Sequence, residues 1–245
     1  MNVRREGDVF VAEENGEVVG SARPDADGGL VLELREPREG IALALLRAAV
    51  AERPGEVIAD GLPSFGSVHL QTDDQGDVAK LVERLVPRVL ASRETVVAPP
   101  RNGWIAVYDA VADSDPRKLG ALGRELSGAS GLVTITIGVE SARLVHLIAL
   151  ERGRLLDEYV SVPSLRAAAS GDQVALRANP TVLARLTGAN PARIRSVART
   201  ADSPDELPAA DELIIELAAA LGLEGAYHGF EGAADLPGAV RVEHA

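Results

Sequence analysis

The strongest constraint on the fold is the order of strand and helix patterns in residues 67–140. Two helical patterns, at about residues 73–88 and 115–127, repeat apolar residues at the spacing of one helix face. Short apolar runs typical of strands flank them, at residues 68–72, 95–97, 104–108 and 132–139. The sequence therefore predicts a β-α-β-β-α-β succession. We expect the 68–72 strand to lie centrally, between the 104–108 and 132–139 strands.

This element order resembles the split βαβ, or ferredoxin-like, arrangement. Apolar runs at residues 144–150 and 154–160, joined by Arg152-Gly153, add a hairpin to it. The predicted fold class is α+β, with three parts: a small N-terminal αβ unit, a ferredoxin-like middle domain with an added hairpin, and a helical C-terminal segment. Their predicted bounds are residues 1–64, 65–163 and 164–245.

Local signals in the C-terminal segment predict several helices. Asn179-Pro180 and Asn190-Pro191 each place a capping residue before a proline suited to the first helical turn. The sequence 203–206 has the form of a capping box, and Pro208 offers a second start for a helix over about 209–221. That helix carries a continuous apolar stripe, which we expect to pack on the middle domain. After Gly222 the glycine-rich, acidic tail is expected to be irregular. In the middle domain, Pro87 is expected to kink or shorten its helix.

Composition excludes several classes of function. The formal net charge is −12, from 37 acidic and 25 basic residues, which disfavours nucleic acid and anionic membranes as partners. Cysteine is absent, which excludes disulfides and thiolate chemistry. A polar N-terminus and the lack of a membrane-length apolar run lead us to expect a cytoplasmic protein. The amino-acid composition, rich in Ala, Arg and Gly and poor in Lys, is typical of proteins from a GC-rich bacterial genome.

Residues 8–60 carry a second resemblance. The hairpin pattern 10–20 around Asn15-Gly16, the strand at 30–34 and the loop Arg38-Glu39-Gly40-Ile41-Ala42 resemble GNAT-type acetyltransferases. The resemblance implies that backbone N–H groups of Gly40 and Ala42 would meet the pyrophosphate of acyl-CoA at a helix start, with Arg38 supplying charge. Pro37 departs from the family pattern, because it stands where Arg or Gln belongs and has no N–H. A turn glycine at Gly40 and a solvated Arg38 would explain the same residues without a ligand.

Few other residues suggest a site. The four histidines are His69, His146, His228 and His244, and they lack the H-x-x-x-H spacing of a local metal motif. His69 with Asp73 and Asp74 would form a metal site only if the fold added another carboxylate. The Asp157-Glu158 pair could face a pocket, although paired acids at strand ends are usually solvated. Trp104 and Tyr108 share one face of a strand, where we expect core packing rather than a ligand platform.

The sequence thus leaves the function and any cofactor open. The leading hypothesis is a non-catalytic binding or assembly protein, acting through a protein partner or a small ligand at a domain junction. The alternative is a divergent acyl-CoA-dependent N-acyltransferase using Arg38, Gly40 and Ala42. A third hypothesis is a metal-dependent enzyme with ligands from distant positions.

Overall fold

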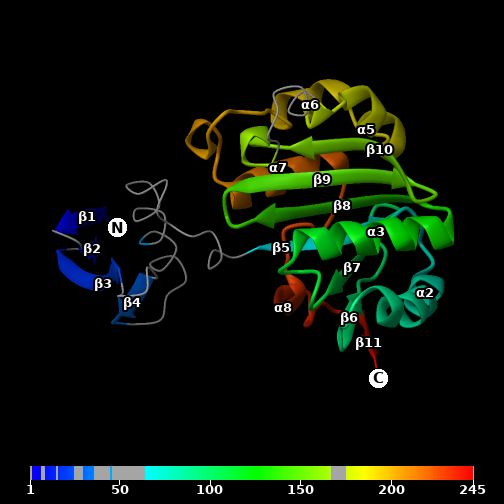
Figure 1. The fold of residues 1–245 in the computed structure, drawn as a ribbon, viewed down its shortest axis with the longest axis horizontal. Coiled ribbons are helices and arrows are strands. Elements are labelled where there is room, and N and C mark those ends of the chain that lie inside the picture. Colours follow the sequence, from blue (N-terminus) through cyan, green and yellow to red (C-terminus); the bar gives the residue numbers. More distant parts are fainter. Residues whose placement is uncertain are drawn as a thin grey trace. The chain divides into compact units, whose positions relative to one another are not determined.

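The chain folds into two compact units, residues 1–62 and 63–245. The computed structural model describes residues 2–6, 9–14, 16–24, 30–35, 45, 64–166 and 175–244. Both units are drawn in Figure 1. We describe each unit by itself.

The first unit contains a four-stranded antiparallel sheet in the order β1-β2-β3-β4. Gly16, with φ of +84°, lies in the β2–β3 turn, where positive φ suits a tight hairpin. The hairpin expected from the Asn-Gly signal is therefore confirmed. Phe10, Ala12, Ala22 and Leu45 form a small core. The strands are β1 (Asn2–Glu6), β2 (Val9–Glu14), β3 (Glu17–Pro24) and β4 (Leu30–Leu34).

The second unit contains both helices and antiparallel strands, so the chain is a mixed α+β protein. Its strands are β5 (Phe65–Leu70), β6 (Glu94–Val97), β7 (Ile105–Asp109), β8 (Val133–Glu140), β9 (Leu144–Glu151), β10 (Arg154–Val160) and β11 (Val240–Glu243). Its α-helices are α2 (Gln75–Val89), α3 (Pro116–Ser130), α5 (Pro180–Thr187), α6 (Pro191–Val197), α7 (Ala210–Leu221) and α8 (Phe230–Ala233). The described part of this unit also contains two 3-10 helices, η2 (Pro163–Leu165) and η3 (Pro204–Glu206).

The strands of this unit form one sheet in the order β10-β9-β8-β5-β7-β6-β11, and its described strand pairs are antiparallel. β5 lies between β7 and β8, with Val68 opposite Val107 on one side and Thr136 on the other. The predicted central position of this strand is thus confirmed. β9 and β10 form the expected added hairpin at one edge.

Helices cover both faces of the sheet (Figure 1). α2 and α3 pack on one face over the apolar side chains of β5 and β7. α5, α6 and α7 pack on the other face, mainly over β8 and β9. The apolar stripe of α7 is buried within the chain, as we expected from its spacing. The helices of the C-terminal segment therefore complete the core of the same compact unit.

Several helices begin at the polar signals in the sequence. Asp115 Oδ1 accepts hydrogen bonds from the N–H groups of Arg117 and Lys118, and Pro116 takes the first turn of α3. Asn179 and Asn190 cap α5 and α6 in the same way. These caps satisfy backbone donors that a helix cannot satisfy internally.

One local expectation was wrong: Pro87 does not end its helix early. α2 continues through Pro87 to Val89, because the buried side chain of Val86 holds this last turn in the core and Leu90 N–H bonds to the Val86 carbonyl. Of the two starts that the sequence offered for the last long helix, the later one agrees with the structure, since α7 begins after Ala209. The capping-box sequence at Ser203 starts only the short η3, without a side-chain cap.

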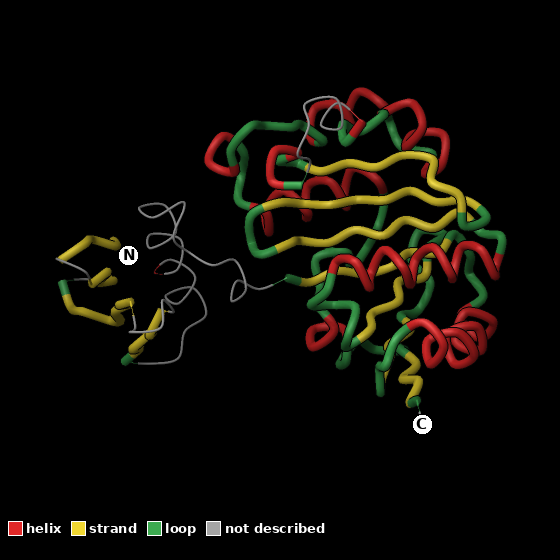
Figure 2. The backbone as a smooth tube through the Cα atoms, in the orientation of Figure 1, coloured by secondary structure: helices red, strands yellow, loops and turns green. Residues whose placement is uncertain are grey.

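The predicted irregular tail was also wrong in part. Residues 240–243 form β11, which pairs with β6 at the sheet edge (Figure 2). A row of polar contacts holds the end of β11 beside β6 and β7. Thr95 Oγ1 donates to Asp109 Oδ2 at 2.7 Å and lies 2.9 Å from His244 Nε2. Arg241 of β11 forms an ion pair with Glu94 of β6, which lies 147 residues earlier in the chain. The tail therefore contributes an edge strand to the sheet.

Candidate functional site

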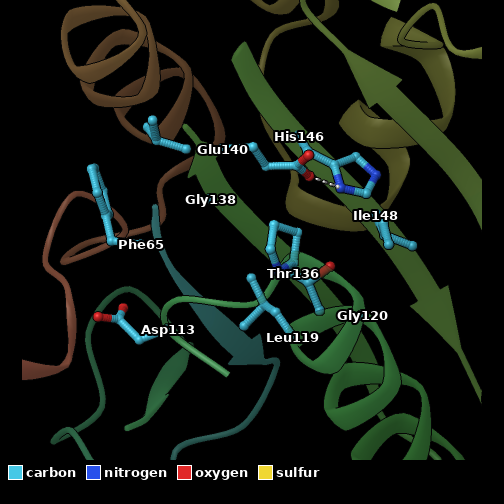
Figure 3. Close-up of a pocket in the computed structure, with 11 residues that line it drawn as sticks. Phe65, Asp113, Leu119, Gly120, Thr136, Gly138, Glu140, His146 and Ile148 are labelled. Atoms are coloured by element: carbon cyan, nitrogen blue, oxygen red, sulfur yellow. Dashed lines mark ion pairs between the residues drawn. The ribbon is translucent and has the colours of Figure 1, made fainter. Parts of the chain in front are cut away.

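A small hollow lies between the first turn of α3 and the sheet (Figure 3). Its cavity volume is ≈ 10 Å³, which is space for about one water molecule. Glu140, His146 and Phe65 border it from β8, β9 and β5 of the sheet, and Asp113 borders it from the segment before α3. Burial raises the pKa of Asp113, whose Oδ1 accepts a hydrogen bond from Gly66 N–H. The hollow is too small for an organic substrate.

Beside this hollow, an ionic cluster ties β8, β9 and β10 to the residue that follows η2. His146 Nδ1 lies 2.9 Å from Glu140 Oε1, and His146 Nε2 lies 2.8 Å from Glu158 Oε1. Arg166 reaches the same carboxylates, with Nη2 at 2.8 Å from Glu140 Oε1. Both ring nitrogens of His146 are therefore occupied by carboxylates.

The electrostatics of the cluster follow from these contacts. Burial alone would lower the pKa of His146, but the hydrogen bonds to Glu140 and Glu158 outweigh it and raise that pKa. The hydrogen bond from His146 in turn lowers the pKa of Glu158. The guanidinium of Arg166 and, when it is protonated, the imidazole of His146 balance two carboxylates, which is the arrangement of a structural ion-pair network.

A second polar pair lies inside the sheet. Ser67 Oγ is 2.9 Å from His69 Nε2, and both side chains are fully buried. Among the residues that the structure describes, His69 Nδ1 has no hydrogen-bond partner, and desolvation lowers the pKa of His69 to about 3. The residues have the chemistry of a nucleophile and a base. Because both side chains are fully buried, they are closed to a substrate.

A larger cavity than the hollow beside α3 lies on the α7 side of the sheet, with a volume of ≈ 140 Å³. Alternate residues of the β7 region form its floor, namely Trp104, Ala106 and Tyr108. Loops after α7 and after α8 form its walls. The lining residues on these walls and at the mouth are Ala98, Pro99, Arg101, Glu224, Gly225, Tyr227, His228, Leu236 and Pro237.

Hydrogen bonds hold this cavity open and in shape. Tyr108 Oη donates to the Gly225 carbonyl at 2.9 Å, which fixes the loop after α7 over the floor. Gly225 has φ of +80°, and a Cβ there would collide with the Tyr108 hydroxyl. Asn102 Nδ2 also donates to Glu224 Oε1 at 3.2 Å. The cavity is therefore preformed, as ligand pockets usually are.

Aromatic and charged groups converge on this cavity. The chain has only one Trp and three Tyr, and the Trp and two of the Tyr line it. Trp104 is 4% exposed, whereas Tyr227 is 47% exposed and its ring centroid lies 4.4 Å from that of His228. Arg101 is exposed and forms no side-chain hydrogen bond or ion pair with any residue that the structure describes. The cavity thus offers an apolar floor, an exposed ring and a cation.

The residues predicted from the sequence have different outcomes. Arg38, Gly40 and Ala42 lie outside the described residues. His69 is buried, whereas Asp73 and Asp74 are exposed, and Asp74 instead caps α2. Over residues 64–166 and 175–244, and the described strands before them, no His/Asp/Glu group is arranged to hold a metal.

The remaining candidates lie on β7 and β10. Trp104 and Tyr108 do pack in the core, as expected, and they also form the floor of the cavity. Asp157 accepts a hydrogen bond from Asn179 N–H, and Glu158 belongs to the ionic cluster.

Sequence reasoning missed the other half of the cavity. Arg101, Tyr227 and His228 carry no motif, and Tyr227 lies more than a hundred residues after the floor in the chain. The scarcity of aromatic residues was the available signal, since an exposed Tyr in such a chain is unusual.

Comparisons with known proteins give no assignment: no family model, curated protein or solved structure matches the chain significantly. Among the described helices, none has the length and apolar character needed to cross a membrane.

Proposed function

We propose that this chain is a non-catalytic binding protein that holds a small organic molecule in the cavity above β7. The observation that carries the proposal is the convergence of Trp104, Tyr108, Tyr227 and Arg101 on one preformed cavity. Such a combination of apolar walls and a few fixed polar groups is typical of small-molecule sites.

The position of the cavity supports this proposal. It lies within the second compact unit, between strands of the sheet and the loops after α7 and α8. The two other polar groups are poorly placed for chemistry, because Ser67 and His69 are fully buried and both nitrogens of His146 are held by carboxylates. Binding is therefore the simpler function.

We also infer that the scaffold of the site is ferredoxin-like. The strand order β8-β5-β7-β6 corresponds to 4-1-3-2 in the β-α-β-β-α-β succession, with α2 and α3 together on one face. This order supports the inference. A cytoplasmic location and partners other than nucleic acid belong to the same proposal, supported by the net charge of −12 and the absence of cysteine.

The test is a ligand screen read by tryptophan fluorescence. Trp104 is the sole Trp and lines the cavity, so its emission reports occupancy directly. Small ring compounds should change the emission and raise the melting temperature, because a ligand of the native state stabilises it. Ala106→Leu, which adds side-chain carbons to the cavity floor, should abolish both responses while retaining the circular dichroism spectrum. Equal responses in both proteins would refute the proposal.

A divergent acyl-CoA-dependent N-acyltransferase is the second candidate. The observation that favours it is the antiparallel β2–β3 hairpin followed directly by β4, the order that the GNAT resemblance implies. Calorimetry with CoA on the intact protein tests it: Arg38→Ala should weaken binding, and Arg35→Ala, an exposed arginine close by, should not. Absence of any CoA binding would remove this candidate.

A further inference from the structure

We propose that the ligand of the cavity above β7 is a single-ring aromatic carboxylate, with the ring over Trp104 and the carboxylate on Arg101. This inference rests on the proposed binding function and names its ligand class. It follows from three properties of the cavity: its volume, its rings and its unpaired cation.

The volume limits the ligand to one ring. A cavity of ≈ 140 Å³ is close to the engineered apolar cavities of about 150 Å³ that bind benzene. A fused ring system or a nucleotide would require the loop after α7 to move. That loop is held at Gly225 by the Tyr108 hydroxyl and at Glu224 by Asn102. A small planar ligand fits without such a rearrangement.

The rings favour a planar ligand over an aliphatic one. Trp104 and Tyr108 lie on one face of β7, and Tyr227 stands at the side with about half of its surface exposed. Aromatic pairs gain stability beyond that of buried area when their rings stack with an offset or meet edge to face. A bound ring would also cover the exposed part of Tyr227.

The charges favour an anion. Arg101 has five N–H donors in a fixed fork that matches a carboxylate, and no described residue accepts from its side chain. The opposite charge at the cavity, Glu224, already accepts from Asn102. Arg101 is the arginine in the lining, and a ligand carboxylate could pair with its guanidinium.

Benzoate and benzyl alcohol are the probes, since they share the ring and differ in charge. On the full chain, followed by Trp104 fluorescence, benzoate should bind with a millimolar dissociation constant, as expected for so few atoms. Benzyl alcohol should bind about tenfold more weakly, because it cannot form the two-donor contact with Arg101. Cyclohexanecarboxylate should also bind more weakly than benzoate, since it lacks the planar ring.

Variants separate the contributions of charge and ring. Arg101→Gln should weaken benzoate about tenfold and leave benzyl alcohol unchanged, whereas Tyr227→Ala should weaken both. Arg117→Gln is the matched control, because Arg117 is exposed on α3, on the opposite face of the sheet. If both probes bind equally and Arg101→Gln affects neither, the carboxylate inference is wrong while the binding function stands. If no ring compound changes Trp104 emission or the melting temperature, both are wrong.

Discussion

Replacing His69 with glutamine should make the stability of the second unit less dependent on pH. In the folded chain the imidazole is fully buried, with Ser67 Oγ as its one hydrogen-bond partner, and its pKa is lowered from 6.5 to about 3. The folded state therefore keeps His69 neutral, while the unfolded chain binds a proton below pH 6.5. Stability must fall as the pH drops through 6.5, and this loss continues until about pH 3.

The magnitude follows from the difference in proton binding. At about pH 5 the unfolded imidazole lies about 1.5 pH units below its pKa, and each unit corresponds to about 1.4 kcal/mol. Protonation of the unfolded chain therefore lowers the free energy of unfolding of the wild type at about pH 5 by about 2 kcal/mol relative to pH 8. Glutamine keeps a polar partner for Ser67 and does not titrate, so the variant should not show this loss.

Urea unfolding followed by Trp104 fluorescence measures the effect. Trp104 is the sole Trp and is buried in the second unit, so the signal reports that unit alone. The free energies of unfolding of wild type and His69→Gln, each measured at about pH 8 and pH 5, give a difference free of the constant cost of the substitution. His228→Gln, at a half-buried histidine in the loop after α7, is the control for the removal of an imidazole. If His69→Gln has the same pH dependence as the wild type, the buried neutral imidazole is refuted.

Three further substitutions test the packing and the ionic cluster. Leu217→Asp should lower the free energy of unfolding by several kcal/mol, because it places an unpaired charge under α7; an unchanged melting temperature with altered sedimentation would instead make α7 an oligomer contact. Gly123→Ala should destabilise by about 1–3 kcal/mol in urea unfolding, because its Cβ would collide with Thr136 Cγ2, and Gly120→Ala, where the nearest atom is 3.3 Å away, should cost less. His146→Gln should lower the free energy of unfolding more at pH 6 than at pH 9, because a raised pKa gives stability that is lost as the pH rises. A loss of stability that does not depend on pH would contradict the charged cluster.

Local features of the fold could be predicted because their causes lie within a few residues. Gly16 permits the positive φ of the β2–β3 turn, and Asp115, Asn179 and Asn190 bond to N–H groups two or three positions along. The order of the patterns over residues 67–140 then placed β5 between β7 and β8, since few sheet topologies suit that succession.

Where a local rule competed with packing, packing decided. Pro87 removes one backbone donor, yet α2 continues because Val86 is buried in the core and its carbonyl still accepts from Leu90. The capping-box sequence at Ser203 forms only the 3-10 helix η3, and Ser203 makes no side-chain cap hydrogen bond there.

The candidate site was decided by tertiary structure alone. Tyr227 and Arg101 meet above β7 because the chain crosses the sheet after α7, and Glu140, Glu158 and Arg166 meet around one histidine because three strand ends lie side by side. Each of these groups is an ordinary polar or aromatic residue in its own neighbourhood. Sequence patterns report which face of an element is apolar, whereas a site needs the distances between elements, and these are set only when the whole core packs.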